Sequence, residues 1–296
     1  MKNKQPLISI IINCFNGERY LRECLNSILS QSYKNYEVIF WDNKSTDKSK
    51  LIFLDIKDSR FKYYSDNLHV TLYSARNKAL KFTKGKYIAF LDVDDMWYPD
   101  KLEKQVEVLE KSSEIGFCYS GFKFLSENSK KLKSAYNNKK LESGFIFSHL
   151  IKNYKVGILT LMVNRSIVNK NQIKFDERFT IMGDLDFVLK LSKISKGIPI
   201  KADLAIYRSH LENLSRKTKL TVQERTIWAN EMIANSFFLK QELIPFIEET
   251  KYLNFITLLQ EEKFIKAFKK IIFLRGIFFI KGLVIIFLKF LKLIIK

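Results

Sequence analysis

The sequence predicts an α/β fold in which a mainly parallel sheet is flanked by helices, with a helical extension towards the C-terminus. The first two strand-like runs are almost wholly apolar, as in strands that are buried on both faces of a parallel sheet. Each run is followed by an amphipathic helical pattern or a helix start. Two such β–α units fit into about 50 residues, and right-handed crossovers between them build a parallel sheet.

The first unit begins with a strand at residues 7–12, LISIII. A helix follows, because apolar side chains recur with helical spacing on one face: Leu21, Cys24, Leu25, Ile28 and Leu29. We expect Asn16 or Gly17 to cap this helix, and Glu18 suits the positive end of its dipole.

Two further units follow. Residues 36–49, YEVIFWDNKSTDKS, indicate a strand, a turn and a helix start, with Ser45 or Thr46 as the N-cap. A third unit is expected over residues 61–82, with its helix at about 72–82.

The middle of the chain continues the alternation. Residues 86–92, KYIAFLD, indicate a further strand, and Pro99 suits the first turn of a helix that runs to about Lys111. Residues 115–125 indicate another strand, and the polar segment 126–143 indicates a loop. We further expect a helix at 183–195, a strand at 198–210 and helices within 221–260.

The composition is globular but strongly basic. Of the 296 residues, 47% are hydrophobic and 28% are charged, which suits one large domain or one domain with an appendage. The 51 Lys and Arg outweigh 31 Asp and Glu, so nucleic acid, anionic lipid or a phosphorylated ligand are the candidate partners. Three cysteines without CxxC spacing favour reduced thiols in a cytosolic protein, and the short apolar run at 7–12 does not indicate a signal peptide.

Polar residues follow the apolar runs, at the edge where an open α/β sheet binds its ligands. These segments are NCFN at 13–16, DN at 42–43 and DVDD at 92–95. Carboxylates gathered there could ligate Mg²⁺ or Mn²⁺, or accept hydrogen bonds from ribose hydroxyls. The alternative is structural, with the acids only ending a strand and capping the next helix. The sequence lacks HExxH, GxGxxG and GxxxxGK, which argues against a zinc protease, a dinucleotide dehydrogenase and a P-loop enzyme.

The order of four segments resembles the family 2 glycosyltransferases of the Rossmann-like GT-A fold. The segments are SIIINCFNGERYLRECLNSILSQ, YEVIFWDNKSTDKS, ARNKAL and GKYIAFLDVDDMWYP. The similarity is dense over residues 7–120 and continues more thinly to about 215. The resemblance implies a GT-A catalytic domain over residues 1–220 with a mixed, mainly parallel sheet. It also implies a nucleotide-diphosphate sugar as donor and, usually, inversion of the anomeric centre.

The family's DxD motif matches Asp92-Val93-Asp94. By this resemblance Asp92 faces the ribose or the metal, Val93 lies at the donor, and Asp94 ligates the metal that bridges the two phosphates. His210, in YRSHLENLS, matches a histidine that can approach the metal or the diphosphate, and the alternative for it is a structural role. A divalent cation, Mn²⁺ or Mg²⁺, would remove the repulsion between the carboxylates and the anionic donor.

Other donor contacts are implied by the same resemblance. Asp42 matches an acid that contacts the nucleoside, and Arg76 matches a basic residue near the donor. Three residues lie in the first nucleotide-contacting loop: Cys14, Phe15 and Glu18.

An inverting transfer also needs a general base that deprotonates the acceptor hydroxyl. Asp184, in TIMGDLDFVLKL, matches the family's base position. The common Glu-Asp pair of that motif is Gly183-Asp184 here, so we place the base on Asp184. The alternative is that Asp184 or Asp186 is only a carboxylate at a helix start.

Residues 263–296 are strongly apolar and hold nine Lys or Arg and no acid. Lysines interrupt this segment too often for a spanning helix, which needs about 20 mostly uncharged residues. On a helix, four lysines fall within an arc of about 80°: Lys281, Lys289, Lys292 and Lys296. We expect the segment to form one or more helices that lie on an anionic membrane surface. The alternative is a helix docked on the protein's own core, and residues 221–262 would form the helical extension that precedes it.

The sequence therefore predicts a membrane-associated glycosyltransferase of bacterial type. It would transfer a sugar to a lipid-linked or growing surface glycan at the cytoplasmic face of the cell membrane, with acceptor contacts in the loops of residues 121–180. One alternative is a nucleotidylyltransferase, although such enzymes usually carry a Gly-rich basic loop where this chain has NCFNGERYL. The other is a non-enzymatic basic protein that binds nucleic acid or membrane. Acid-rich strand ends do not suit nucleic acid, so we expect no nucleic-acid partner.

Overall fold

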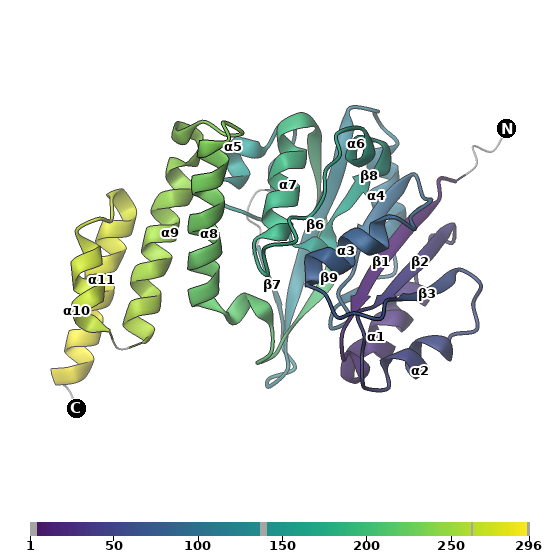
Figure 1. The fold of residues 1–296 in the computed structure, drawn as a ribbon, viewed down its shortest axis with the longest axis horizontal. Helices are drawn as coiled ribbons and strands as arrows, with labels where there is room; N and C mark the ends of the chain where they lie inside the picture. Colours follow the sequence, from purple (N-terminus) through teal and green to yellow (C-terminus); the bar gives the residue numbers. More distant parts are fainter. Residues whose placement is uncertain (1–4, 137–140, 262, 295–296) are drawn as a thin grey trace. The chain divides into compact units, whose positions relative to one another are not determined.

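A computed structural model describes residues 5–136, 141–261 and 263–294 (Figure 1). The chain forms two compact units, Met1–Leu211 and Glu212–Lys296. The domain boundary expected at residue 220 falls inside a helix of the second unit, α8 (Thr218–Ala234).

The first unit is built on a nine-stranded sheet. Its strands are β1 Ile8–Cys14, β2 Tyr36–Asp42, β3 Phe61–Ser65, β4 Tyr87–Phe90, β5 Met96–Trp97, β6 Ile115–Ser126, β7 Leu132–Ser134, β8 Met162–Asn164 and β9 Lys196–Ser209. The order across the sheet is β3-β2-β1-β4-β8-β6-β9-β5, and β7 pairs with β6.

The N-terminal half of this sheet is parallel, as the apolar runs predicted. Strand β1 pairs in parallel with both β2 and β4, and β2 pairs in parallel with β3. Strand β8 is antiparallel to β4 and to β6, so β6 and its parallel neighbour β9 run in the direction of β4. The mixed α/β sheet is therefore confirmed. The strand order reverses between β1 and β4, and at such a point the loops after the two strands diverge and leave room for a ligand.

Helices cover both faces of the sheet (Figure 1). They are α1 Glu18–Leu29, α2 Ser49–Leu54, α3 Leu72–Leu80, α4 Lys101–Leu109, α5 Phe147–Leu150, α6 Arg165–Lys170 and α7 Gly183–Ile194, with a 3₁₀ turn η1 at Ile158–Thr160. Ile10 of β1 belongs to the same buried cluster as Leu25 of α1. On the opposite face, the ring centroid of Phe90 lies 6.0 Å from that of Phe187 of α7. Alternate side chains of buried strands thus meet different helix layers.

The start of α1 is satisfied from a neighbouring loop. Gly17 is its N-cap, as expected, and has no side chain to accept a hydrogen bond. Instead the N–H of Gly17 donates to the hydroxyl of Ser49, and the N–H of Glu18 donates to the carboxylate of Asp47, each at 2.9 Å. The loop after β2 therefore locks the loop after β1 in place.

The expected cap of α2 is wrong. Helix α2 begins at Ser49 with Lys48 as its N-cap, so neither Ser45 nor Thr46 occupies that position. The backbone N–H of Ser45 instead donates to Asp42 at 2.8 Å. The polar groups of this loop form hydrogen bonds with the end of β2 and the start of α1, and helix α2 begins only after them.

Two further expectations need correction. Helix α4 begins at Lys101, so Pro99 precedes its first turn, and the helix ends at Leu109. The polar segment 126–143 is not wholly loop, because β7 lies within it, and residues 137–140 lie outside the described chain. The sequence also did not predict β5, β8, α5 or α6, all of them short elements.

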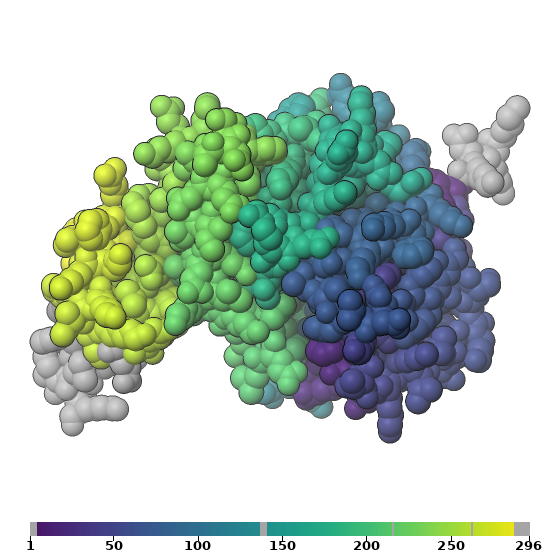
Figure 2. Space-filling model, in the orientation of Figure 1, coloured from purple at the N-terminus to yellow at the C-terminus, as the bar shows by residue number. Residues whose placement is uncertain are grey.

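The second unit is helical. Besides α8 it contains a 3₁₀ turn η2 at Leu214–Arg216 and the helices α9 Lys240–Gln260, α10 Phe264–Ile271 and α11 Gly276–Ile294. The tail therefore consists of two helices, which meet at Gly276 in the left-handed region of φ, at +54°. Figure 2 shows α10 and the first part of α11, in yellow, on the surface of this unit.

One side of the tail packs on α9. Phe255 and Leu259 of α9 form a buried cluster with Ala267 and Ile271 of α10. The alternative of a helix docked on the protein's own core is thus partly right. None of the helices in the described ranges is long and apolar enough to cross a membrane. The side chains of Lys289, Lys292 and Lys296 lie outside those that the structure describes.

Candidate active site

A buried arginine joins two of the predicted acids. Asp92 follows β4 at the carboxyl edge of the sheet, and Asp184 lies in the first turn of α7. Arg76, on α3, donates from Nη2 to Asp92 Oδ1 at 2.5 Å and from Nη1 to Asp184 Oδ1. The structure therefore brings together three residues that are distant in sequence, and Arg76 serves as a bridge between carboxylates.

Burial and charge act in opposite directions within this bridge. Burial disfavours the charged form of Arg76, but Asp184 and Asp92 more than offset this and raise the pKa of the guanidinium. Burial raises the pKa of Asp184 to about 6, even though Arg76 acts against the shift. The side chain of Asp184 is still 26% exposed. A partly open carboxylate with a pKa near 6 suits a general base that works close to neutral pH.

The second acid of α7 is of a different kind. Asp186 is fully buried and pairs with Lys190, one helical turn away, at 2.7 Å. The structural alternative raised from the sequence therefore describes Asp186, whereas Asp184 faces the strand-end acids.

The acid loop after β4 is held from β9. Nε2 of His210 lies 2.9 Å from Oδ2 of Asp94. The backbone N–H of Arg208 donates to Asp95 at 3.0 Å, and its Nε donates to the carbonyl of Asp94 at 3.1 Å. Burial and neighbouring carboxylates raise the pKa of both Asp94 and Asp95. Asp92 and Asp94 are 32% and 22% exposed, while Asp95 is buried, so the first two acids are open to a ligand.

The first predicted donor loop is only partly presented to solvent. Phe15 is half exposed, and its ring centroid lies 4.2 Å from that of His69. Glu18 accepts a hydrogen bond from the N–H of Lys48 at 2.9 Å. Cys14 is buried, and burial raises the pKa of its thiol. Of the three residues predicted in this loop, Phe15 and Glu18 are therefore exposed and Cys14 is buried.

Asp42 and Val93 connect this loop to its neighbours. The buried carboxylate of Asp42 accepts hydrogen bonds from the N–H of Ser45 at 2.8 Å and from the hydroxyl of Tyr63 at 2.5 Å. Val93 packs on the turn at Gly17, where an added Cβ would lie 3.0 Å from its Cγ2. Both residues lie at the predicted edge, and both help to shape it.

The metal site expected from Asp92, Asp94 and His210 is not a complete protein cage. Within the described ranges, no three His, Cys, Asp or Glu side chains are grouped so that they could hold a metal ion. Mg²⁺ is often held by one or two carboxylates, with substrate phosphates and water completing its shell. Asp92 and Asp94 fit that arrangement, since both are partly exposed acids on one short loop.

Two residues of this region were not predicted from the sequence. Arg208 holds the acid loop, and it stands in the YRSH segment beside the histidine that was singled out. Tyr73 lies under the start of α7, where its hydroxyl donates to the carbonyl of Ile181 at 3.0 Å. No local pattern in the sequence marks Tyr73, because the residue that accepts its hydrogen bond lies 108 residues away.

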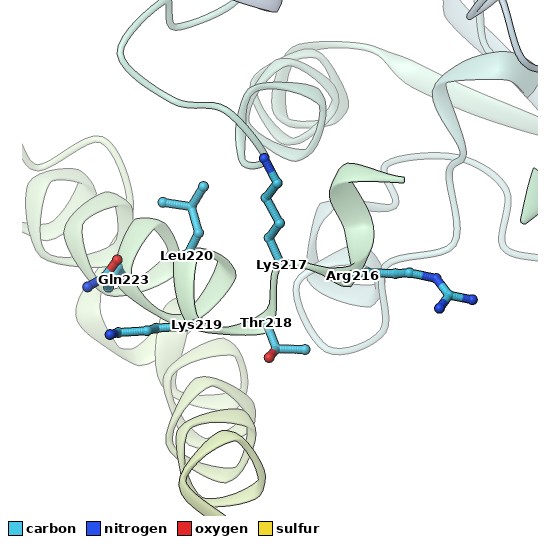
Figure 3. Close-up of a pocket in the computed structure, with 6 residues that line it drawn as sticks. All are labelled: Arg216, Lys217, Thr218, Lys219, Leu220 and Gln223. Atoms are coloured by element: carbon cyan, nitrogen blue, oxygen red, sulfur yellow. The ribbon is translucent and has the colours of Figure 1, made fainter. Parts of the chain in front are cut away.

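A pocket in another part of the chain differs from this cluster of acids. It has a volume of about 530 Å³ and lies in the second unit. Its lining residues are Arg216, Lys217, Thr218, Lys219, Leu220 and Gln223. Figure 3 shows the three cationic side chains pointing in different directions, so they do not converge on one ligand group.

Comparison with known proteins gives a family match and several relatives. The family model described as "Glycosyl transferase family 2" matches residues 9–164, more than half of the chain. WfgD of Escherichia coli, a UDP-Glc:alpha-D-GlcNAc-diphosphoundecaprenol beta-1,3-glucosyltransferase, is 33% identical over 57% of this chain and 64% of its own length. The match therefore spans slightly less than two thirds of that relative. TuaG of Bacillus subtilis, a putative teichuronic acid biosynthesis glycosyltransferase, is 28% identical over 81% of this chain and 93% of its own length.

Solved structures confirm the expected GT-A fold. TarS of S. aureus, residues 1–349 in complex with UDP-GlcNAc, superposes with a TM-score of 0.67 at 19% identity. The match covers 81% of this chain and 71% of that chain of TarS residues 1–349. The mannosyltransferase PcManGT from Pyrobaculum calidifontis, in complex with GDP-Man and Mn²⁺, has a TM-score of 0.60 at 14% identity, with 85% of this chain and 70% of that chain covered.

Proposed function

The chain belongs to glycosyl transferase family 2, and on that premise we propose that it transfers a sugar from a nucleotide-diphosphate sugar to a surface-glycan or lipid-linked acceptor. The names of its relatives support this acceptor class, since WfgD acts on a diphosphoundecaprenol-linked sugar and TuaG is assigned to teichuronic acid synthesis. The observation that carries the proposal is the bridge of Arg76 between Asp92 and Asp184. It joins the acid of the predicted donor site to the acid of the predicted acceptor site.

Asp184 is the proposed general base of an inverting transfer. Its Oδ1 is bonded to Arg76, so we assign Oδ2 as the atom that takes the proton of the acceptor hydroxyl. As that proton moves, the acceptor oxygen forms a bond to the anomeric carbon on the face opposite the donor diphosphate. The bond between the anomeric carbon and the diphosphate oxygen breaks, and the nucleoside diphosphate leaves with that electron pair. Arg76 keeps Asp184 in the charged form that this step requires.

Asp92 and Asp94 would hold a divalent cation, Mn²⁺ or Mg²⁺, shared with the donor diphosphate. When bound, such a cation neutralises the charge that develops on the leaving group. His210 and Arg208 orient Asp94 through its carboxylate and its carbonyl, respectively. The Mn²⁺ complex of PcManGT supports metal use in this fold without assigning ligands here.

A donor screen tests the catalytic proposal. Purified protein with Mn²⁺ is offered a panel of nucleotide sugars, and release of the nucleoside diphosphate is measured with and without a synthetic GlcNAc-diphosphate-lipid. We expect one donor to be consumed, and consumption to require Asp94. Release of pyrophosphate from a nucleoside triphosphate, with no nucleotide sugar consumed, would instead favour the nucleotidylyltransferase alternative.

We also propose that the C-terminal hairpin, defined as residues 263–286, binds anionic membrane surfaces and holds the enzyme at the inner face of the cell membrane. On α10 and its C-cap, the side chains of Ile265, Phe268 and Ile272 are 76%, 63% and 71% exposed. Their spacing places them on one side of the helix. Further exposed apolar side chains come from α11: Ile277, Ile280, Leu283 and Val284.

Charge favours a lipid partner for this surface. Basic side chains accompany the apolar ones along the hairpin: Lys263, Lys266, Lys269, Lys270, Arg275 and Lys281. Apolar side chains next to lysines, without acids, are typical of helices that lie in the headgroup region of an anionic bilayer. Each basic residue near such a surface contributes about 1 kcal/mol.

Flotation with liposomes tests this proposal. The triple variant Ile265→Ser, Phe268→Ser, Ile272→Ser is compared with a matched triple at exposed apolar positions elsewhere: Leu51→Ser, Ile194→Ser and Leu239→Ser. We expect the natural chain and the matched triple to float with anionic vesicles but not with neutral ones, and the α10 triple to stay in solution. Equal flotation of both triples would contradict the proposal. Substitution is cleaner than truncation, because removing the hairpin would expose Phe255 and Leu259.

A further inference from the structure

Residue 183, immediately before the proposed base, must be glycine because there is no room for a side chain at this position. Gly183 opens α7 in ordinary helical backbone, which any residue can adopt. A Cβ added there would lie 2.5, 2.6 and 2.7 Å from Cε2, Cδ2 and Cγ of Tyr73. These distances are shorter than those at which carbon atoms pack. The ring of Tyr73 therefore occupies the place of a side chain at residue 183.

Tyr73 is itself held firmly. It is buried on α3, and its hydroxyl donates to the carbonyl of Ile181 at 3.0 Å. Its ring stacks on that of Phe175, with centroids 5.7 Å apart and planes 9° apart. The start of α7 and the residues just before it thus contact the ring and the hydroxyl of Tyr73.

The same helix supplies the partner of the base. Tyr73 and Arg76 are three residues apart on α3, and the guanidinium carbon of Arg76 lies 5.6 Å from the centroid of the Tyr73 ring. Arg76 in turn donates to Asp184 Oδ1. One face of α3 therefore contacts both the backbone that precedes Asp184 and its carboxylate.

We propose that Tyr73 is a positioning residue that fixes the start of α7, so that the carboxylate of Asp184 is held on Arg76 with its second oxygen towards the acceptor. The inference rests on the proposed function, since it concerns the base of that reaction. It also accounts for the departure from the family's Glu-Asp pair, because an aromatic ring stands where the first acid would project.

Four single variants test the inference in the full-length protein. Tyr73→Phe keeps the ring and removes the hydrogen bond to Ile181, whereas Gly183→Ala forces the ring and α7 apart. The matched control is Gly197→Ala, at the amino end of β9, where an added Cβ would lie 2.3 Å from Cζ of Phe117. Asp184→Asn reports on the proposed base itself. For each, kcat per folded molecule, the KM for the donor selected by the screen and the Tm are measured.

We expect Tyr73→Phe to lower kcat by several-fold and Gly183→Ala to lower it by about tenfold or more. In both variants the KM for the donor should stay within about twofold of the natural value. Gly197→Ala should lower the Tm but leave kcat per folded molecule unchanged. The double variant Tyr73→Ala, Gly183→Ala should recover part of the kcat lost in Gly183→Ala, because the clash is gone.

The outcomes separate the two proposals. If Asp184→Asn loses transfer while Tyr73→Phe and Gly183→Ala keep the natural kcat, the positioning role of Tyr73 is wrong and the proposed base stands. If these two variants change only the Tm, as Gly197→Ala does, the contact is merely structural and the inference again fails. If Asp184→Asn turns over normally, the base assignment is wrong, and the positioning inference falls with it.

Discussion

The strand-end acids and the C-terminal hairpin are two concentrations of charge that the chain holds in opposite ways. At the strand ends, Arg76 lies buried between Asp92 and Asp184, and Asp94 lies against His210. In the hairpin, no acid occurs from residue 263 onward, and the lysines stand beside exposed apolar side chains. The first set of charges is satisfied within the fold, whereas the second is directed outward.

This difference predicts two kinds of response to mutation. Charges that share partners in a buried network affect one another, so single substitutions should have large and non-additive effects. Charges on an open surface act through a screened field, so their effects should be small and should add.

The largest effect is expected at Asp184. Replacing it by Asn should reduce kcat for transfer by about 10²- to 10⁴-fold, the usual contribution of a general base, while donor binding stays nearly unchanged. Single-turnover kinetics and calorimetric titration of the nucleoside diphosphate measure the two quantities.

Asp186→Asn is the matched control on the same helix. Asp186 is buried against Lys190, so this variant should lose stability and retain kcat per folded molecule. Comparable losses of kcat at both positions would show that the helix start as a whole matters, and would remove the special role of Asp184.

The next effect concerns the acid loop. Asp94→Ala should weaken Mn²⁺-dependent binding of the nucleoside diphosphate by about 10- to 100-fold, because it removes a proposed ligand from the cation. Calorimetry with and without Mn²⁺ measures the loss. Asp100→Ala serves as the control, since Asp100 pairs with Lys104 on the surface at the start of α4. Unchanged metal dependence in Asp94→Ala would exclude this residue from the site.

A smaller, graded effect is expected from pH. The pKa of Asp184 is raised to about 6, and only its deprotonated form can accept a proton. Transfer should therefore fall by about tenfold per pH unit below that value and level off above it. Arg76→Gln removes the charge that favours ionised Asp184, so the acid limb should move to higher pH. An acid limb that stays in place in this variant would mean that another group controls it.

These two regions also show which features of the fold could be predicted from the sequence. Strand β1 was predicted because burial on both faces leaves a continuous apolar run, and helix α1 because burial of one face leaves a periodic apolar pattern. Strands β5 and β8 were missed, since two or three residues carry no period. Lys281 could be placed on a polar arc by spacing alone, but that spacing did not predict the left-handed backbone at Gly276, where α10 and α11 meet.

The residues of the candidate site were easier to predict from the sequence than the contacts between them. The acid cluster itself drew attention to Asp92 and Asp94, and the resemblance pointed to Arg76. No spacing rule could pair Arg76 with Asp184, because 108 residues separate them. The same distance hid the contact of Tyr73 with the start of α7. Buried polar networks are specified by tertiary packing, so their members can be named from sequence before their partners can.

The smallest effects are expected from single lysines of the hairpin. Each of Lys266→Gln, Lys269→Gln and Lys270→Gln should weaken partition onto anionic vesicles by about 1 kcal/mol, which is about fivefold. The double and triple combinations should weaken it by the sum of these steps, since all three lysines are exposed and act through a screened field. Sedimentation with vesicles of increasing anionic lipid content gives the partition coefficients, and raising the salt concentration should shrink every step. Lys104→Gln, a substitution of a surface lysine that pairs with Asp100, should change nothing. If substitution of a single lysine removed all binding, or if the effects departed strongly from additivity, the hairpin would recognise one specific headgroup at a defined binding site. The contrast between the two regions would then fail.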